Sequence, residues 1–489
     1  MQPCDLSAAD ARFLIGSRQL SPVELLDSCL QRVEAVNRQV NGVVAIDEER
    51  ARREAAAAEQ AVMRGDPLPA LHGLPIGIKD LVDTQGLRTT YGSKVYVQNV
   101  PDRDESLVAA LRAHGGIVCM KTNTPEWGAG GNTFNPVYGV SGNPFAPELT
   151  CGGSSSDSAI ALSTGMVPLA LGSDNAGSLR IPAALCGVVG MRASAGLVPS
   201  EMRRVALSHL HVDGPMARSA KDTLLMLSCL ATRNTRDALA GIPDPELAEP
   251  GLPVDLGSLR VAYSTDLDGF ASIDPVIRQT YADRVNRLRA FFRVCTQASP
   301  DFSDADRVYE VLRAVAFVGT WGPRYREAPA KWGRLVRENL EQASRFTIED
   351  IGAAHADYTR IYQDAQSFFQ RCDLLVLPTV AVSAWPKHAI YPAQIDGRAV
   401  QGYFDWVRVT YAITLINHPC ISIPCGRDGN GIPFGLQLVA PRGRDAWLLK
   451  VAIALEELFT RDPVTQRPVP DPEWLATQRA EDPLGRPVA

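Results

Sequence analysis

Apolar and polar positions in the first part of the chain follow a pattern that predicts a helix, a strand and a second helix. The segment Ser21-Pro22-Val23-Glu24 has the composition of a helix N-terminus, with a capping serine, a proline in the first turn and a glutamate three residues after the serine. Apolar residues at helical spacing follow it: Leu26, Cys29, Leu30, Val33 and Val36. A short apolar run at 43–46 predicts a strand, and the alanine-rich segment 48–64 predicts a more polar helix.

The alternation of helices and strands continues along the chain. Further segments fit the pattern, with helices predicted at 106–114, 275–292 and 304–314 and strands at 117–121 and 259–263. Such an alternation favours one α/β unit whose sheet is covered on both faces. The Pro-rich, acidic segment 234–256 predicts a surface excursion, and the Pro-rich segment 461–489 predicts a surface strap or a partly disordered tail.

A serine cluster stands at each end of an apolar run in residues 150–187, TCGGSSSDSAIALSTGMVPLALGSDNAGSLRIPAALCG. From Ser154 the pattern predicts a short helix that stops near Gly165, and residues 166–171 predict a strand. A helix of about twelve residues rises about 18 Å and a strand of about six returns about 20 Å, so the two clusters should meet. The second cluster, 172–178, predicts a tight loop before another helix. Unpaired backbone N–H groups at such a junction suit an anion, which favours a serine nucleophile with an oxyanion hole.

A serine nucleophile needs a base, and no histidine lies near either cluster in the sequence. The chain has seven histidines, and the G-x-S-x-G motif of α/β-hydrolases does not occur in it. An apolar, strand-like run at 74–78 ends instead in Lys79. A lysine at the tip of a buried strand loses hydration, which lowers its pKa and lets it act as a neutral base. The alternative is an ordinary strand-end lysine paired with Asp80.

Three motifs carry a resemblance to a known family: GLPIGIKD at 73–80, GGSSSDS at 152–158 and GSDNAGSLRIPAA at 172–184. The chain resembles the amidase signature family of serine amidohydrolases, and the likeness runs from about Leu6 to Leu455. The resemblance implies an α/β fold with a large, twisted, mixed β-sheet covered by helices on both faces. It also implies three parts: an N-terminal helical region packed on the core (1–66), an amidase signature catalytic domain (67–460) and the Pro-rich tail (461–489).

The family's mechanism, carried onto these motifs, implies a relay of two serines and a lysine. Ser178 would be the nucleophile, Ser154 a bridging serine held by a cis peptide bond, and Lys79 the base. The oxyanion hole would be formed by the amides of Asn175, Ala176, Gly177 and Ser178, and each good donor contributes a few kcal/mol in the transition state. Asp174 and Arg180 would brace this loop without taking part in the reaction.

Substrate contacts are expected for four side chains in or near these motifs: Trp127, Phe134, Tyr138 and Ser155. Further aromatic residues lie in segments that line the substrate funnel in the family: Trp321, Tyr325, Trp385, Tyr403 and Trp406. The packing of the loops around 127–140, 313–326 and 385–410 would set the shape of an acyl pocket with apolar and aromatic walls.

The chain departs from the family's pattern in both serine clusters. Asn175 and Ala176 stand where threonine and glycine are common, and an alanine held at positive φ would cost about 1 kcal/mol. Ser156 and Asp157 replace the second glycine pair. We expect the Asp157 carboxylate to narrow the site or to repel anionic substrates.

Three functions fit these observations. The first is an amidase that hydrolyses the C–N bond of a carboxamide, including an anilide, an oligoamide or a carbamate. The second is the glutaminase subunit of a tRNA-dependent amidotransferase, which commonly has glutamine where this chain has Ile181. The third is a non-catalytic binding descendant, which the presence of Lys79, Ser154 and Ser178 disfavours. Cys151 as a thiol nucleophile lacks a supporting motif, and the pair His209 and His211 lacks enough ligands for a metal site.

Composition is that of a globular enzyme without a cofactor motif. The chain has 489 residues and a net charge of -6, with no basic run of the kind that a nucleic-acid partner needs. No apolar run is long enough to span a membrane, and the N-terminus lacks a signal segment, so we expect no membrane association and a cytoplasmic protein. The ten cysteines include no C-x-x-C motif and are expected to be reduced core residues. We expect a small-molecule amide as substrate, and a homodimer stays open.

Overall fold

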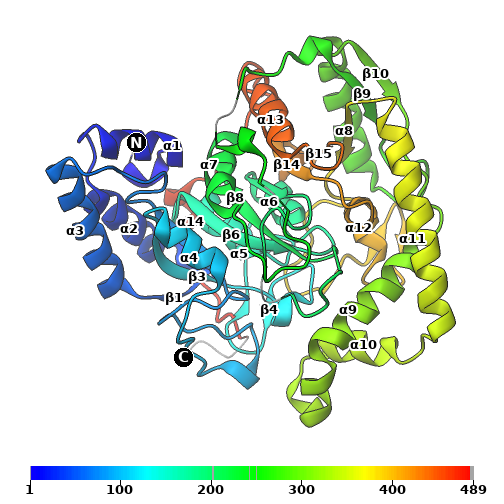
Figure 1. Cartoon of the computed structure of the whole chain (residues 1–489), viewed down its shortest axis with the longest axis horizontal. Helices are drawn as coiled ribbons and strands as arrows, with labels where there is room; N and C mark the ends of the chain where they lie inside the picture. The colour runs from blue at the N-terminus through cyan, green and yellow to red at the C-terminus, as the bar shows by residue number, and fades with distance from the viewer. Residues whose placement is uncertain (1, 201–202, 242, 249–250, 485–489) are drawn as a thin grey trace.

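Eleven strands form one mixed sheet in a computed structural model that describes residues 2–200, 203–241, 243–248 and 251–484 (Figure 1). Across the sheet the strands are β1 (Val43–Ile46), β3 (Ile117–Thr122), β2 (Pro75–Lys79), β6 (Leu169–Asp174), β8 (Val212–Ala217), β7 (Val189–Arg192), β14 (Cys420–Arg427), β15 (Pro433–Val439), β11 (Leu374–Pro378), β9 (Arg260–Tyr263) and β10 (Val294–Gln297). Two short hairpins lie outside it: β4 (Phe134–Asn135) with β5 (Gly139–Val140), and β12 (Gln394–Ile395) with β13 (Arg398–Ala399).

Strand direction brings several chain segments to one edge of the sheet. β2 runs parallel to both of its neighbours, β3 and β6, so the C-terminal ends of these three strands lie together. β8 pairs antiparallel with β6, with Leu169 opposite Ala217 and Asp174 opposite Val212. Lys79 at the end of β2 and Asp174 at the end of β6 therefore lie at the same edge as the start of β8.

Helices cover both faces of the sheet, which confirms the predicted α/β layers. Along β6, Leu169 and Leu171 join one hydrophobic cluster and Ala170 joins another, because successive side chains of a strand point to opposite faces. On one face lie α5 (Ser156–Ser163) and α6 (Arg180–Cys186), and on the other lie α4 (Ser106–Ala113), α7 (Ala220–Leu230) and α13 (Asp445–Phe459). The other helices are α1 (Ala8–Gly16), α2 (Pro22–Val40), α3 (Glu48–Arg64), α8 (Pro275–Leu288), α9 (Ala305–Glu327), α10 (Arg334–Ala343), α11 (Ile348–Phe369), α12 (Arg408–Leu415) and α14 (Pro472–Thr477).

Several element boundaries differ from those predicted, and two of the differences affect the site. The strand expected at 166–171 lies at Leu169–Asp174, because residues expected in a loop continue the ladder with β8 up to the pair Asp174 and Val212. The helix expected to end at residue 314 continues to Glu327. Its extra turns are held by Phe317 and Trp321, which pack in a cluster of aromatic side chains. The segment expected as the loop 313–326 is therefore helical.

The Pro-rich C-terminal segment packs in part against an N-terminal helix. α14, in the Pro-rich segment, lies against α2, and its Leu475 is fully buried. At the opposite side of the molecule, α9 and α10 form a helical hairpin that projects from the body, as Figure 1 shows. None of the helices in the described ranges is long and apolar enough to cross a membrane.

Candidate active site

Lys79 is the last residue of β2 and is fully buried. Its Nζ donates hydrogen bonds to three hydroxyl oxygens: Ser154 Oγ at 2.7 Å, Ser155 Oγ at 2.8 Å and Ser173 Oγ at 3.1 Å. Ser154 and Ser155 precede α5, whereas Ser173 lies near the end of β6. The structure thus brings the two serine clusters together at Lys79.

Burial changes the acid–base chemistry of Lys79. Loss of hydration lowers its pKa from the ordinary lysine value to about 7, although the carboxylates of Asp213, Asp174 and Asp157 act in the opposite direction. A lysine with this pKa is partly neutral near neutral pH. Its Nζ can then accept a proton from a neighbouring hydroxyl.

The three hydroxyls around Lys79 are not equivalent. Ser155 Oγ donates to the carbonyl oxygen of Ser173 at 3.0 Å and accepts from the Ser173 amide at 3.1 Å. Its proton is therefore already engaged, and its side chain is fully buried outside the cavity. The structure places Ser155 beside Lys79 as a support, not against the substrate space where we expected it.

Ser178 lies next to the first serine cluster. Its carbonyl oxygen accepts a hydrogen bond from the Ser155 amide at 3.1 Å, and its half-buried side chain lines the same cavity as Ser154. The peptide bond between Gly153 and Ser154 is cis, as the resemblance implies. Lys79, Ser154 and Ser178 therefore belong to one group of residues. The two serines of this group line the cavity, and Lys79 lies behind them.

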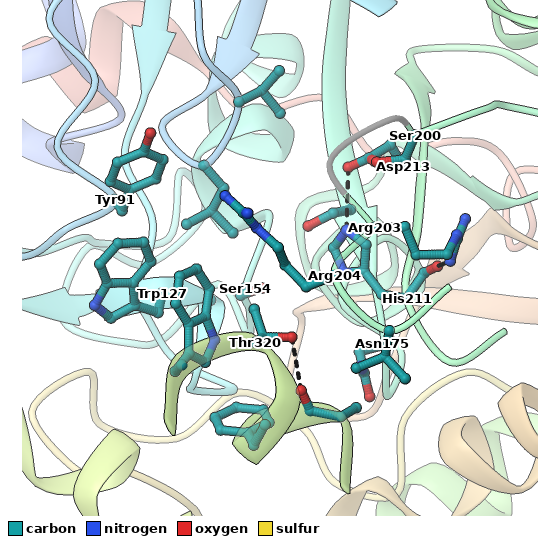
Figure 2. Close-up of a pocket in the computed structure, with 18 of the residues that line it drawn as sticks. Tyr91, Trp127, Ser154, Asn175, Ser200, Arg203, Arg204, His211, Asp213 and Thr320 are labelled. Carbon is teal, nitrogen blue, oxygen red and sulfur yellow. Dashed lines mark hydrogen bonds and ion pairs between the residues drawn. The ribbon is translucent and has the colours of Figure 1, made fainter. Parts of the chain in front are cut away.

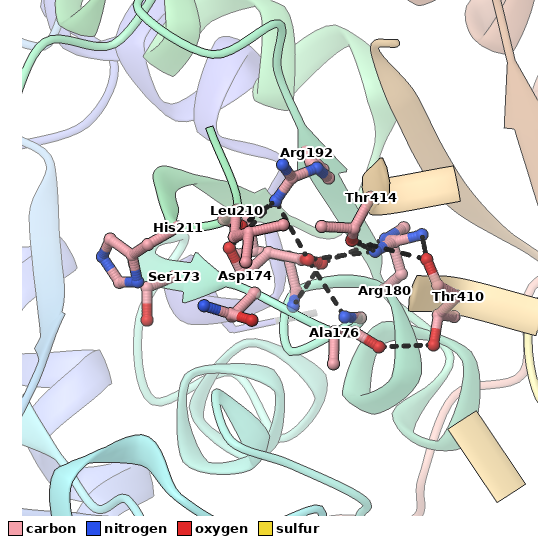
Figure 3. Close-up of polar contacts among 12 residues, drawn as sticks. Ser173, Asp174, Ala176, Arg180, Arg192, Leu210, His211, Thr410 and Thr414 are labelled. Carbon is pink, nitrogen blue, oxygen red and sulfur yellow. Dashed lines mark hydrogen bonds and ion pairs between the residues drawn. The ribbon is translucent and has the colours of Figure 1, made fainter. Parts of the chain in front are cut away.

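Asp174 braces the loop that precedes Ser178 (Figure 3). It is fully buried and accepts hydrogen bonds from Arg180 Nη2 and Nε, both at 3.0 Å, while Arg192 Nη1 lies 3.4 Å from its Oδ1. Burial alone would raise the pKa of Asp174, but the Arg180 guanidinium holds it well below its usual range. Asp174 and Arg180 are thus bracing partners, as the sequence predicted.

The four amides that we expect to form the oxyanion hole differ in whether they are already hydrogen-bonded. No acceptor within the described residues engages the N–H groups of Asn175, Ala176 and Ser178. The Gly177 amide, however, donates to Asp174 Oδ1 at 3.0 Å and is not free for an oxyanion. The loop requires glycine at position 177 for its conformation. Its φ is +119°, and a Cβ there would lie only 2.5 Å from the Thr410 hydroxyl oxygen. Ala176 has no positive φ, so the expected strain does not arise.

The two serines open into a cavity of about 420 Å³ (Figure 2). Five aromatic side chains form part of its wall: Tyr91, Tyr96, Trp127, Phe317 and Trp321. The Trp127 ring stacks on Tyr91 at 4.6 Å between centroids and lies 4.1 Å from the Trp321 ring of α9. The expected role of Trp127 as a lining residue thus agrees with its position.

Other expected lining residues lie elsewhere. Phe134 is 59% exposed on β4, and the Tyr138 ring lies under the Arg88 guanidinium at 5.3 Å, so the β4–β5 hairpin directs both away from the cavity. Trp385 and Trp406 pack against each other in the core with ring centroids 4.8 Å apart. None of these four side chains lines the cavity.

Asp157 also differs from expectation, because it does not face the substrate space. Its side chain is fully buried and accepts hydrogen bonds from Thr133 Oγ1 at 2.7 Å and Ser156 Oγ at 2.8 Å. Burial raises its pKa to about 7. The carboxylate therefore neither narrows the cavity nor repels a substrate directly.

Several lining residues were not singled out by the sequence as substrate contacts. His211 lines the cavity, and its Nε2 lies 3.4 Å from Oδ1 of Asp213, which is opposite Ser173 in the β6–β8 ladder. Arg203, Arg204 and several residues of α9 also line it. Of these, the sequence offers only the spacing His211-x-Asp213 as a signal, and that spacing is more typical of a metal site than of a substrate contact.

The two remaining alternatives for the chemistry find no support in the geometry. His209 is buried with its ring stacked on Tyr358 at 4.8 Å, and the described residues hold no group of three metal-ligating side chains. Cys151 is buried outside the cavity, and burial raises its pKa well above that of an ordinary thiol.

Comparison with known proteins agrees with the geometry. The family model described as Amidase matches residues 24–449. An acylamidase of Rhodococcus erythropolis is 33% identical over 92% of this chain and 95% of its own length. A subunit of the glutamyl-tRNA(Gln) amidotransferase of Thermus thermophilus is 32% identical over 93% of this chain and 97% of its own. In fold, the chain is similar to a bacterial aryl acylamidase of the amidase signature family, with a TM-score of 0.85, 24% identity and 99% of each chain covered.

Proposed function

Because the chain belongs to the amidase family and is a hydrolase of amide C–N bonds, we propose that Ser178 carries out this hydrolysis through an acyl-enzyme. The observation that carries the proposal is the contact of 2.7 Å between Lys79 Nζ and Ser154 Oγ, made by a buried lysine whose pKa is about 7. A neutral lysine next to a hydroxyl on the cavity surface is a base in position for a serine nucleophile.

In the first half of the reaction the proton moves away from the nucleophile. Neutral Lys79 takes the proton of Ser154 Oγ, which takes the proton of Ser178 Oγ as the latter attacks the amide carbon. The oxyanion that forms accepts hydrogen bonds from the free amides of the 175–178 loop, and each such donor is worth about 3 kcal/mol in the transition state.

In the second half the same relay runs in reverse and then repeats. Lys79 returns its proton through Ser154 to the leaving nitrogen, the C–N bond breaks, and the amine departs. Water then gives its proton to the relay and attacks the acyl carbon, which releases the carboxylic acid and restores the Ser178 hydroxyl. No metal or cofactor enters these steps.

We propose a small-molecule amide with an aromatic group as the substrate, such as an anilide. The support is the aromatic wall formed by Tyr91, Trp127 and Trp321, on which a planar ring can stack. The relative at 33% identity is named an acylamidase, which agrees with an amide as substrate. All the named residues belong to one chain, so the proposal does not need a second protein; a homodimer and a cytoplasmic location stay predictions.

The test is mass spectrometry of the intact protein after incubation with a fluorophosphonate, in the wild type, Ser178→Ala and Lys79→Ala. We expect an adduct on Ser178 that is absent from Ser178→Ala and slow to form in Lys79→Ala. Ser163→Ala is the matched control, because Ser163 is buried on α5 away from the cavity and should leave labelling unchanged.

The same samples separate the alternatives. Release of ammonia from glutamine only when tRNA and the other amidotransferase subunits have been added would replace the proposal with the amidotransferase function. Absence of both labelling and turnover across a panel of amides and esters would favour a binding protein. Labelling of any residue other than Ser178 would contradict the assigned nucleophile.

A further inference from the structure

The acidic side chains that line the cavity are all engaged within the protein. Asp83 accepts a hydrogen bond from the Tyr91 hydroxyl. Glu105 accepts one from the Asp83 amide at 2.9 Å, and burial raises its pKa to about 8, so it is largely protonated at neutral pH. Asp213 pairs with His211. Glu105 is thus largely neutral and Asp213 contacts the His211 ring, whereas the Asp83 carboxylate is hydrogen-bonded but has no cationic partner among the described residues.

The arginines that line the cavity differ in how many ionic and hydrogen-bonding partners they have within the protein. Arg203 pairs with Asp237 at 3.1 Å, and Arg313 donates to Asn339 Oδ1 at 3.0 Å. The Arg324 guanidinium lies 5.8 Å from the centre of the Tyr96 ring without a carboxylate partner in the described residues.

Arg204 is the least satisfied of these arginines. Its side chain lines the cavity and makes no hydrogen bond, ion pair or ring contact with any residue that the structure describes. Figure 2 shows its side chain directed toward the side of the cavity where Tyr91 and Trp127 lie, although the residue is exposed to solvent. Arg204 thus brings a positive charge without an ion-pair partner to the exposed part of the cavity lining, near the aromatic side chains.

We propose that the substrate carries an anionic group, such as a carboxylate, on or near its aromatic ring, and that Arg204 is the specificity-determining residue that binds this group. The inference rests on the proposed function and narrows its substrate class. A planar guanidinium binds a carboxylate through two parallel hydrogen bonds, and the enclosing walls strengthen the charge attraction. Arg324 adds a second positive charge on the same wall. The buried position of Asp157 removes the repulsion that would oppose such a substrate.

The test compares 4-acetamidobenzoate with its neutral, nearly isosteric partner 4-acetamidobenzamide. Release of the aromatic amine is followed by chromatography for the wild type, Arg204→Gln and Arg204→Glu. Arg461→Gln is the matched control, because Arg461 is an exposed arginine at the end of α13, outside the cavity. A second pair, the monoanilide of terephthalic acid and its carboxamide, places the charge on the acyl half.

For at least one pair we expect kcat/KM of the wild type to favour the anionic member by about tenfold, the size of one charge-assisted hydrogen bond in a partly open site. Arg204→Gln should abolish this preference, Arg204→Glu should reverse it, and Arg461→Gln should retain it. An equal loss for both members, or no preference in the wild type for either pair, would overturn the inference.

Binding keeps this test independent of turnover. The same compounds are titrated by calorimetry into Ser178→Ala and into Ser178→Ala combined with Arg204→Gln. A charge preference in binding without turnover by the wild type would contradict the proposed function and retain the inference. Turnover of both members without a charge preference would support the proposed function and overturn the inference.

Discussion

Two groups of side chains line or adjoin the cavity, and they are held in place in different ways. On the relay side, Lys79, Ser154 and Ser173 are all buried and lie at the edge of a sheet whose strands fix the backbone around them. On the aromatic side, Trp127 and Trp321 come from segments far apart in the sequence and meet through their rings, and Arg204 lines the same cavity from a third segment. Under the proposed function, the relay side would determine which bond reacts, and the aromatic side would determine which molecule is held there. Substitutions on the two sides should therefore separate kcat from KM.

Lys79→Met should give the largest effect and act on kcat. Methionine matches the length of lysine but has no basic group, so kcat should fall by about 1,000-fold or more while KM stays within about threefold. Methionine also removes the donor to three buried hydroxyls, so the free energy of unfolding is measured beside kcat and should fall by about 1–3 kcal/mol. Steady-state kinetics on an anilide and urea unfolding measure the two quantities. A rise in KM at unchanged kcat would place Lys79 on the substrate side and break the comparison.

Asp174→Asn should have the largest effect on stability. It leaves the guanidinium groups of Arg180 and Arg192 buried without their counter-charge, and breaking a buried pair in this way costs about 3–5 kcal/mol. Urea unfolding measures the loss. Glu49→Gln is the control, because its pair with Arg53 lies on the surface of α3 and should contribute almost nothing. Equal stabilities for the two variants would show that the buried network does not brace the oxyanion loop.

The same contrast explains what the sequence could predict. The helix and strand between the two serine clusters are local elements, so their lengths alone placed Ser154 near Ser173 and Ser178. Lys79 could be placed because a buried strand ends in it. The fully buried ladder between β6 and β8, by contrast, extends a strand through Gly172 and Ser173, whose residue types favour a loop.

The aromatic side of the cavity could not be predicted from the sequence because it depends on tertiary packing. The extra turns of α9 are held by contacts between Trp321 and Trp127, which lie almost 200 residues apart in the sequence. Phe134 matched the family's segment, yet the β4–β5 hairpin turns it to the surface. The sequence motif indicated that Asp174 and Arg180 brace the loop, but it did not indicate that the Gly177 amide donates its hydrogen bond to the Asp174 carboxylate.

Trp321→Leu should act on KM. It removes an aromatic face from the wall while keeping an apolar side chain, so KM for an anilide should rise by about tenfold at nearly unchanged kcat. Trp474→Leu is the matched control, since this partly exposed tryptophan lies on α14 outside the cavity. A fall in kcat without a change in KM would mean that α9 positions the relay, and the division between the two sides would fail.

Asp213→Asn should give the smallest effect on activity, a shift of its pH dependence. It tests whether a residue of the cavity wall influences the base Lys79. Lys79 acts as a base only when neutral, so wild-type activity should fall as the pH drops through about 7, the pKa of Lys79. Three carboxylates, those of Asp213, Asp174 and Asp157, stabilise its charged form. Removing the charge of Asp213 lowers the pKa of Lys79 further and moves the acidic limb of the profile to lower pH.

At pH 6, Asp213→Asn should therefore retain about two to five times more of its own plateau activity than the wild type does. Asp83→Asn is the control, because Asp83 lines the same cavity but is not among the charges that act on Lys79. Profiles of kcat/KM between pH 5 and 9 distinguish the two variants. If the acidic limb of the pH profile is the same in Asp213→Asn as in the wild type, the His211–Asp213 pair does not influence Lys79 and acts only as part of the cavity wall. If the limb moves, the pair links the wall of the cavity to the base, and a substrate that contacts His211 can alter the protonation of Lys79.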